Sequence, residues 1–255
     1  VRILPDGKAR LDRTWLVLDK AGEMPREGRN RDDLSAFSLP SFERQEDGRQ
    51  ITLRTKCLKL TIALDKAALL WQNAQGEYLA ADVDAGAYQF DPASQQIRHK
   101  LVSTAGEHYY GFGEVSGALN KAGRQLLMRN MDHPGYSAKN GSPLYKNFPY
   151  YVTWNPQTQL AFGLFYDNLA TTRFDLRHTG TSRTAGQRSY SAEGGDLDYY
   201  FLYGPSLREV IEKFTRLTGR MLLPPRWSLG YLGSTMNYTE APDAQAQLAA
   251  FGEKC

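Results

Sequence analysis

Short segments in which hydrophobic and polar residues alternate run through most of the chain and predict β-strands. Residues 58–64, with the sequence LKLTIAL, alternate at every second position, as in a strand that buries one face. We predict further strands over residues 14–18, 50–55, 96–102, 109–112, 125–129, 145–154, 160–166, 172–176 and 196–203. Many short strands without helical periodicity between them indicate an antiparallel sandwich or barrel.

Residues 20–33 interrupt this pattern. They are dense in charge and glycine and contain Pro25. A helix here would have too few apolar residues to pack against a core, so we predict an exposed loop.

One segment has helical periodicity, over about residues 206–218. It opens with Ser206 and Glu209, the spacing of a capping box in which each side chain binds the backbone amide of the other residue. Gly219 is well placed to end the helix. The apolar stripe that we assign to core packing consists of Leu207, Val210, Ile211, Phe214 and Leu217.

The last thirty residues follow a different pattern. After Pro224 and Pro225, a stiff connector, residues 227–233 predict an apolar strand of the kind that is buried on both faces. Asn237 or Thr239 could cap a final helix whose inner side holds Ala246, Leu248, Ala249 and Phe251. A parallel strand needs neighbouring strands, so residues 226–255 are predicted to begin a larger barrel. This chain of 255 residues cannot complete that barrel, because a (β/α)₈ barrel alone takes about 250 residues. Residues 1–225 form the preceding β-domain.

Composition excludes several classes of protein. The chain has 31 Lys+Arg against 28 Asp+Glu, and 12% of its residues are aromatic, which indicates a folded, soluble protein. No run approaches the roughly 20 apolar residues of a membrane span, and the interspersed charges argue against nucleic-acid binding. The start of the chain lacks the features of a signal peptide, so we expect a cytoplasmic location.

The usual motifs of metal and cofactor chemistry are missing from the sequence. The four histidines are scattered singly, and there is no nucleophile elbow, phosphate loop or dinucleotide fingerprint. We therefore expect no metal and no cofactor. Asp196 and Asp198 would share a strand face and could hold a cation, but turn chemistry after Gly194 and Gly195 is the preferred interpretation.

The most promising segment for binding is the long loop over residues 129–145. It is polar and aromatic and too long for a tight hairpin. Carboxylates beside aromatic rings suit sugars, because the carboxylate accepts hydroxyl protons and the ring packs on the C–H face. Composition alone favours a structural loop in which Asp132 caps a turn.

A set of ordered motifs resembles the N-terminal β-sandwich of glycoside hydrolase family 31, the family of α-glucosidases and α-xylosidases. The resemblance is strong from about residue 109 to residue 231. The motifs are Tyr109–Lys121, Met131–Asp132, Pro143–Lys146, Phe162–Asn168, Leu197–Phe201, Tyr203–Ser206, Leu217–Arg220 and Leu223–Tyr231.

The resemblance implies a galactose-mutarotase-like sandwich followed by the first βα unit of a catalytic (β/α)₈ barrel. Members hydrolyse terminal α-linked glucose or xylose with retention, using two carboxylates. In the family both are aspartates on later barrel strands, so no catalytic residue is expected within these 255 residues, which should be inactive alone. Asp132 matches a carboxylate that overhangs the active site and binds sugar near the cleavage point.

After the first barrel strand the chain departs from many α-glucosidases. They have Ser-Arg followed by an aromatic residue of the sugar pocket, whereas this chain has Ser234, Thr235 and Met236. The resemblance thus places Met236 at the pocket wall. The α-xylosidase branch also lacks that arginine and has an Asn-Tyr nearby, as this chain does at Asn237 and Tyr238. The resemblance therefore implies an α-glucosidase that acts on an oligosaccharide or α-glucoside, with an α-xylosidase as the alternative.

Two other classes remain as alternatives. A carbohydrate-binding sandwich without catalysis would have no use for the apolar strand over residues 227–233, whose large side chains are costly to expose. An aldose epimerase needs an acid and a base facing each other, and Glu114 with His108 or His178 are the candidates. Homo-oligomerisation of the full-length enzyme is left open.

Overall fold

The computed structural model describes residues 1–133, 135, 137–139, 143–178, 185–230 and 243–254. The chain divides into two compact units, residues 1–219 and residues 220–255. No helix in this described part is long and apolar enough to cross a membrane.

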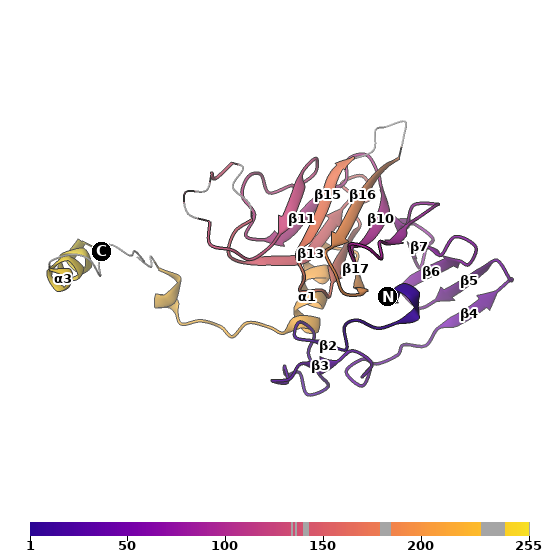
Figure 1. Ribbon diagram of the computed structural model, residues 1–255, viewed down its shortest axis with the longest axis horizontal. Coiled ribbons are helices and arrows are strands. Elements are labelled where there is room, and N and C mark those ends of the chain that lie inside the picture. Colours follow the sequence, from indigo (N-terminus) through magenta and orange to yellow (C-terminus); the bar gives the residue numbers. More distant parts are fainter. Residues whose placement is uncertain (134, 136, 140–142, 179–184, 231–242, 255) are drawn as a thin grey trace. The chain divides into compact units, whose positions relative to one another are not determined.

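Two five-stranded antiparallel sheets form the centre of the first unit (Figure 1). The first sheet has the order β1-β17-β14-β13-β11, with bounds Arg2–Ile3, Leu197–Gly204, Ala161–Tyr166, Asn147–Trp154 and His108–Gly113. The second has the order β12-β15-β16-β10-β9, with bounds Gln125–Met128, Thr172–His178, Gly186–Ala192, Ile97–Ser103 and Tyr88–Phe90. The antiparallel β-sandwich predicted from the alternating segments is confirmed.

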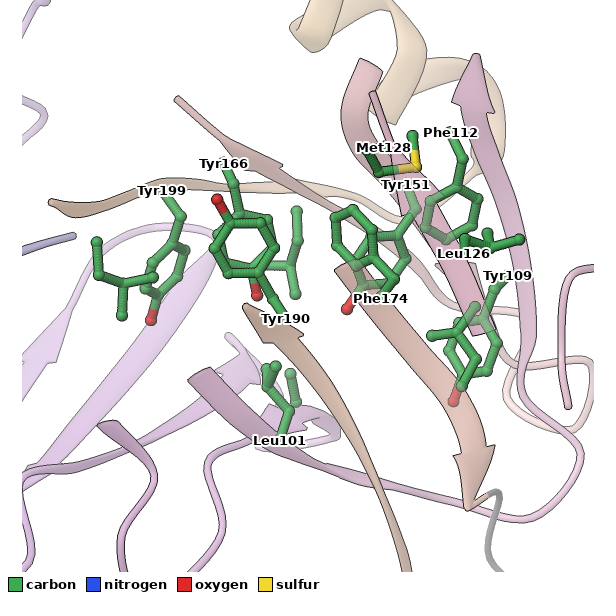
Figure 2. Close-up of a cluster of buried hydrophobic side chains, with 14 of the residues drawn as sticks. Leu101, Tyr109, Phe112, Leu126, Met128, Tyr151, Tyr166, Phe174, Tyr190 and Tyr199 are labelled. Atoms are coloured by element: carbon green, nitrogen blue, oxygen red, sulfur yellow. The ribbon is translucent and has the colours of Figure 1, made fainter. Parts of the chain in front are cut away.

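Aromatic rings fill the space between the two sheets. Tyr166 of β14 stacks on Tyr190 of β16 with 3.8 Å between ring centroids, and Figure 2 shows these rings overlapping. Phe174 of β15 meets Phe112 and Tyr151 of the first sheet edge to face, at 5.1 and 5.5 Å. Such arrangements stabilise a core beyond the area that they bury.

A third sheet and a short hairpin extend this sandwich. The sheet has the order β4-β5-β6-β7-β8, and Trp71 of β7 stacks on Phe201 of β17 at 4.2 Å. A one-turn 3₁₀ helix, η1, precedes the hairpin β2-β3. The bounds are Glu43–Glu46 (β4), Gln50–Arg54 (β5), Leu58–Ala63 (β6), Ala68–Asn73 (β7), Tyr78–Ala81 (β8), Arg13–Thr14 (β2), Arg29–Asn30 (β3) and Pro5–Gly7 (η1).

Helix α1 (Leu207–Thr218) covers the outer face of the first sheet. Phe214 stacks on Tyr150 of β13 at 3.7 Å, and the buried Val210 packs with Phe165 of β14. All six residues of β14 are buried because one face meets the sandwich core and the other meets α1. The predicted helix, its capping box and its end at Gly219 are confirmed.

The segment predicted as an exposed loop, residues 20–33, is exposed only in part. Arg29 and Arg31 are buried, at 3% and 7% exposure, and Arg29 belongs to β3. Their charge suggested that these side chains are exposed to solvent, but Arg31 forms ion pairs with Asp167 and Asp198 of the sandwich. A buried charge is tolerated when it is paired and hydrogen-bonded.

The second unit does not show the strand predicted over residues 227–233. The first residues of that segment belong to the 3₁₀ helix η2 (Arg226–Leu229), in which the Ser228 hydroxyl donates to the Pro225 carbonyl. Residues 231–233 lie outside the described residues. Residues 226–230 pair with no strand within the described part, and a parallel strand requires such neighbours. The final helix exists as α3 (Ala244–Lys254), with Asp243 accepting from the Ala246 amide, while Asn237 and Thr239 lie outside the described residues.

Candidate functional site

The loop that carries Asp132 connects β12 to β13 and is closed at its base by two asparagines. The Asn147 amide N–H donates to Asn130 Oδ1 at 2.8 Å, and Asn147 Nδ2 donates to the carbonyl of Leu144 at 2.9 Å. The Met131 N–H donates to the same carbonyl at 3.3 Å. These bonds hold the two ends of the loop together.

Asp132 lies on this loop with its carboxylate exposed. Its Oδ1 accepts a hydrogen bond of 2.7 Å from the Tyr145 hydroxyl on the returning side of the loop. Oδ2 accepts no hydrogen bond from the described residues. The Tyr145 ring is itself 51% exposed and lies beside a carboxylate, the combination that the sequence suggested for sugar binding.

The connection between β11 and β12 braces the loop from one side. The Glu114 N–H donates to the Lys146 carbonyl at 2.7 Å, and the Gly117 N–H donates to the Ala138 carbonyl at 2.9 Å. Gly113 has φ +81°, and a β-carbon there would overlap the Lys146 carbonyl. Only glycine allows the two backbones to approach this closely.

Lys121 in turn holds this connection in shape. Its ammonium donates to the carbonyls of Val115, Ser116 and Ala118 at 3.1, 3.2 and 2.6 Å, which uses all three of its protons. Burial lowers the pKa of this ammonium, and nearby Arg124 lowers it further. The Asp132 loop therefore rests on a preorganised support.

The two aspartates considered as cation ligands have another role. Asp196 accepts the backbone amides of Arg10 and Leu11 at 2.9–3.0 Å, and Asp198 pairs with Arg31 at 2.6 Å. Asp167 joins Arg31 at 3.1 Å, and burial raises the pKa of its carboxyl, against the attraction of Arg31. These carboxylates fasten the N-terminal segment to the sandwich. Among the described residues, no three His, Cys, Asp or Glu side chains are grouped as metal ligands.

Of the acid and base candidates of an epimerase, Glu114 and His108 each have a different hydrogen-bond partner in the described residues. Glu114 Oε2 accepts the Lys146 amide, whereas His108 Nδ1 lies 2.7 Å from the Tyr110 hydroxyl. The side chain of His178 lies outside the described residues. A histidine that sequence reasoning left without a role, His99, is fully buried and contacts Asp82 at 2.8 Å and Tyr166 at 2.9 Å, where no substrate can reach it.

The role of Asp132 in substrate binding stays a prediction, and sequence reasoning missed the residues that hold its side chain and its loop. Tyr145 and Lys121 both stood in motifs of the resemblance, yet neither motif indicated its hydrogen-bond partner. Met236 lies outside the described residues, so its position at a pocket wall stays a prediction.

The fold is that of a galactose-mutarotase-like β-sandwich, with the braced loop of Asp132 between β12 and β13. Residues 1–175 match the family model described as the glycosyl hydrolase 31 N-terminal galactose mutarotase-like domain. The chain belongs to this family.

Similar proteins agree with this membership. The chain is 35% identical over 212 residues to Alpha-glucosidase 2 of Bacillus thermoamyloliquefaciens, covering 82% of this chain and 25% of that protein. It is 29% identical over 191 residues to Alpha-xylosidase XylQ of Lactiplantibacillus pentosus, covering 74% and 23%. A solved structure of the family 31 dextranase of Flavobacterium johnsoniae in complex with glucose has a TM-score of 0.64 at 28% identity, covering 74% and 22%. The chain thus spans about a quarter of the length of the relatives it matches.

Proposed function

We propose that the chain is the N-terminal part of a retaining α-glucosidase that acts on terminal α-linked glucose. The match of residues 1–175 to the family model, together with the 35% identity to an α-glucosidase, supports this most directly. The lower identity of 29% to an α-xylosidase supports glucose over xylose. In this proposal, residues 226–255 begin the catalytic barrel.

The chemistry of the proposed enzyme is divided between the two parts of the protein. Retaining hydrolysis needs one carboxylate that attacks the anomeric carbon and a second that protonates the leaving oxygen and then activates water. We assign both to the later barrel strands. Asp132 contributes binding, since an exposed carboxylate accepts hydrogen bonds from sugar hydroxyls, and Met236 lines the sugar pocket.

The assay that tests this function compares the full-length parent enzyme with the 255-residue chain on aryl α-glucoside and aryl α-xyloside. We expect the parent to cleave the glucoside faster and to release the α-anomer first, as seen by proton NMR, while the 255-residue chain is inactive. A preference for the xyloside would favour the α-xylosidase, and turnover by the 255-residue chain would refute the division of roles.

The assigned role of Asp132 has its own test in the parent enzyme. Asp132→Asn should lower kcat/KM roughly tenfold to hundredfold, because hydrogen bonds to charged groups contribute about 1.5–3 kcal/mol. Tyr145→Phe should lower it about fivefold by releasing the carboxylate from its 2.7 Å hydrogen bond, corresponding to about 1 kcal/mol.

The double variant decides whether Tyr145 acts through Asp132. If it does, Tyr145→Phe has no further effect in the Asp132→Asn background. Additive losses would show that Tyr145 binds substrate independently, and an unchanged kcat/KM in Asp132→Asn would remove the loop from the substrate site.

A further inference from the structure

The strand β4 forms an unpaired edge of the third sheet. It pairs with β5 on one side and with no other strand in the part of the chain that the structure describes, and Figure 1 shows it at the outer margin of that sheet. All of its residues, Glu43 to Glu46, are exposed. An unpaired edge is a template for pairing with another chain, so the chemistry of this edge decides what can pair with it.

Two residues of β4 direct their backbone groups outward. Residue pairs that are hydrogen-bonded alternate with pairs that are not along an antiparallel ladder. At the turn between β4 and β5, the Asp47 N–H donates to the Gln50 carbonyl at 3.3 Å. Two residues earlier Gln45 therefore bonds to β5, whereas Arg44 and Glu46 direct their N–H and C=O groups away from it. These outward groups can pair with one further strand.

The side chains of these two residues carry opposite charges. Arg44 and Glu46 lie on the same face of β4 and form an ion pair of 2.5 Å, with 57% and 44% of their side chains exposed. Charged side chains on an edge strand usually oppose pairing, because a second strand brings like charges together or removes them from water. In β4 the two signs stand two residues apart, so a strand with the same sequence can supply the opposite charge at each position.

One register of two antiparallel copies of β4 satisfies both the hydrogen bonds and the charges. When Gln45 lies opposite the same residue of the second copy, Arg44 of each copy lies opposite Glu46 of the other. Their outward N–H and C=O groups then form hydrogen-bonded pairs, and the charges alternate in sign on one face. A shift by two residues places like charges opposite each other, which is destabilising, and a shift by one places outward groups opposite inward ones.

We propose that a second copy of this chain pairs with β4, so that the third sheets of the two copies join into one continuous sheet. The interface is isologous, because the same edge serves both copies about a two-fold axis that passes between the two Gln45 residues. Since only one short strand of each copy takes part, the dimer is weak and exchanges with the monomer. The proposal does not rest on the α-glucosidase function, because the Asp132 loop connects strands of the two other sheets.

Sedimentation equilibrium of the 255-residue chain at roughly 10–500 µM tests the proposal, since small interfaces associate weakly. We expect a monomer–dimer equilibrium within this range. Arg44→Glu should raise the dissociation constant about tenfold or more, because it makes both cross-strand pairs like-charged. The double variant Arg44→Glu with Glu46→Arg restores opposite charges and should return the constant to within about threefold of the wild-type value. The matched control, Arg208→Glu in the exposed ion pair of α1, should leave it unchanged.

Glu46→Pro separates pairing from folding. The Glu46 N–H points away from β5, so proline at this position removes a hydrogen bond of the dimer and none of the sheet. Thermal unfolding of the monomer should stay close to that of the wild type, while the dimer is lost. A chain that remains monomeric over the whole concentration range would overturn the proposal, as would a dimer that survives Glu46→Pro or a charge exchange that restores nothing. None of these outcomes bears on hydrolysis by the parent enzyme, which the glucoside assay tests independently.

Discussion

The side chain of Arg188 lies at the centre of the sandwich with 1% of its area exposed. Its Nη1 donates to Glu107 Oε2 and to the Val102 carbonyl at 2.8 and 2.7 Å, and its Nε donates to the Tyr151 hydroxyl at 3.1 Å. The Tyr109 hydroxyl adds a second donor to Glu107 at 2.7 Å. The charges of Arg188 and Glu107 compensate each other, so removing the guanidinium leaves the Glu107 carboxylate buried without a counter-charge.

Arg188→Gln should therefore lower the free energy of unfolding by about 3–5 kcal/mol, measured by urea denaturation. The control is the same substitution in the exposed pair of Arg177 with Asp175, where Arg177 is 53% exposed. Arg177→Gln should cost less than about 1 kcal/mol. Equal losses of unfolding free energy in the two variants would contradict the claim that a buried ion pair matters more to stability than an exposed one.

Single residues also show which parts of the site a sequence reveals. Asp132 stands in a motif of the resemblance, whereas the composition of its loop alone favours a turn, and its role in substrate binding stays a prediction. The bond from Tyr145 and the three carbonyls around Lys121 depend on how the loops fold back on each other, which no spacing in the chain encodes.

At the scale of elements, α1 shows how local sequence can determine a boundary. The Ser206 hydroxyl accepts the Glu209 amide, and Glu209 Oε2 accepts the Ser206 amide at 3.1 Å and its hydroxyl at 2.6 Å. These hydrogen bonds lower the pKa of the Glu209 carboxyl below its ordinary value. The carboxylate form thus supports the helix above the ordinary pKa, and the support is lost as the pH falls through the lowered value.

Ser206→Ala should lower the free energy of unfolding at pH 7 by about 1 kcal/mol, because the Glu209 amide loses its acceptor and the Glu209 carboxylate loses the hydroxyl that donates to it. The difference from the wild type should shrink at acid pH, where Glu209 is protonated in both proteins. Ser206→Thr keeps the hydroxyl and serves as the control. A loss that does not change with pH would mean that Glu209 does not take part in the cap.

The strands divide into those that local pattern predicts and those that it does not. Most alternating segments form strands close to their predicted bounds, for example β10 and β14. β16 was not predicted because its inward positions include Arg188, which interrupts the hydrophobic alternation although it is buried. The apolar residues from Trp227 were predicted as a strand, but apolar composition alone cannot supply the neighbouring strands that a sheet requires.

For the molecule as a whole, the layered architecture followed from sequence because many short strands bury one face each. The third sheet, β4 to β8, could not be assigned separately, since its packing on the sandwich depends on contacts between distant residues such as Trp71 on Phe201. Its unpaired edge at β4 was likewise beyond sequence reasoning, because only the register of β4 on β5 shows which backbone groups point outward.

The first compact unit should fold without the second. A chain of residues 1–219 retains the sheets, α1 and the Gly219 cap, so we expect its free energy of unfolding to lie within about 0.5 kcal/mol of that of the 255-residue chain. Urea denaturation followed by circular dichroism gives this comparison. A loss of several kcal/mol would show that residues 220–255 stabilise the sandwich.

The pairing of β1 with β17 has a consequence for how the protein is made. Arg2 lies opposite Asp198, and the nearby Arg31 also needs Asp198. A ribosome adds about 5–20 residues per second, so β1 is synthesised roughly 10–40 s before its partner β17. During that interval β1 has no strand to pair with, so the first sheet closes at this edge only after β17 has been synthesised.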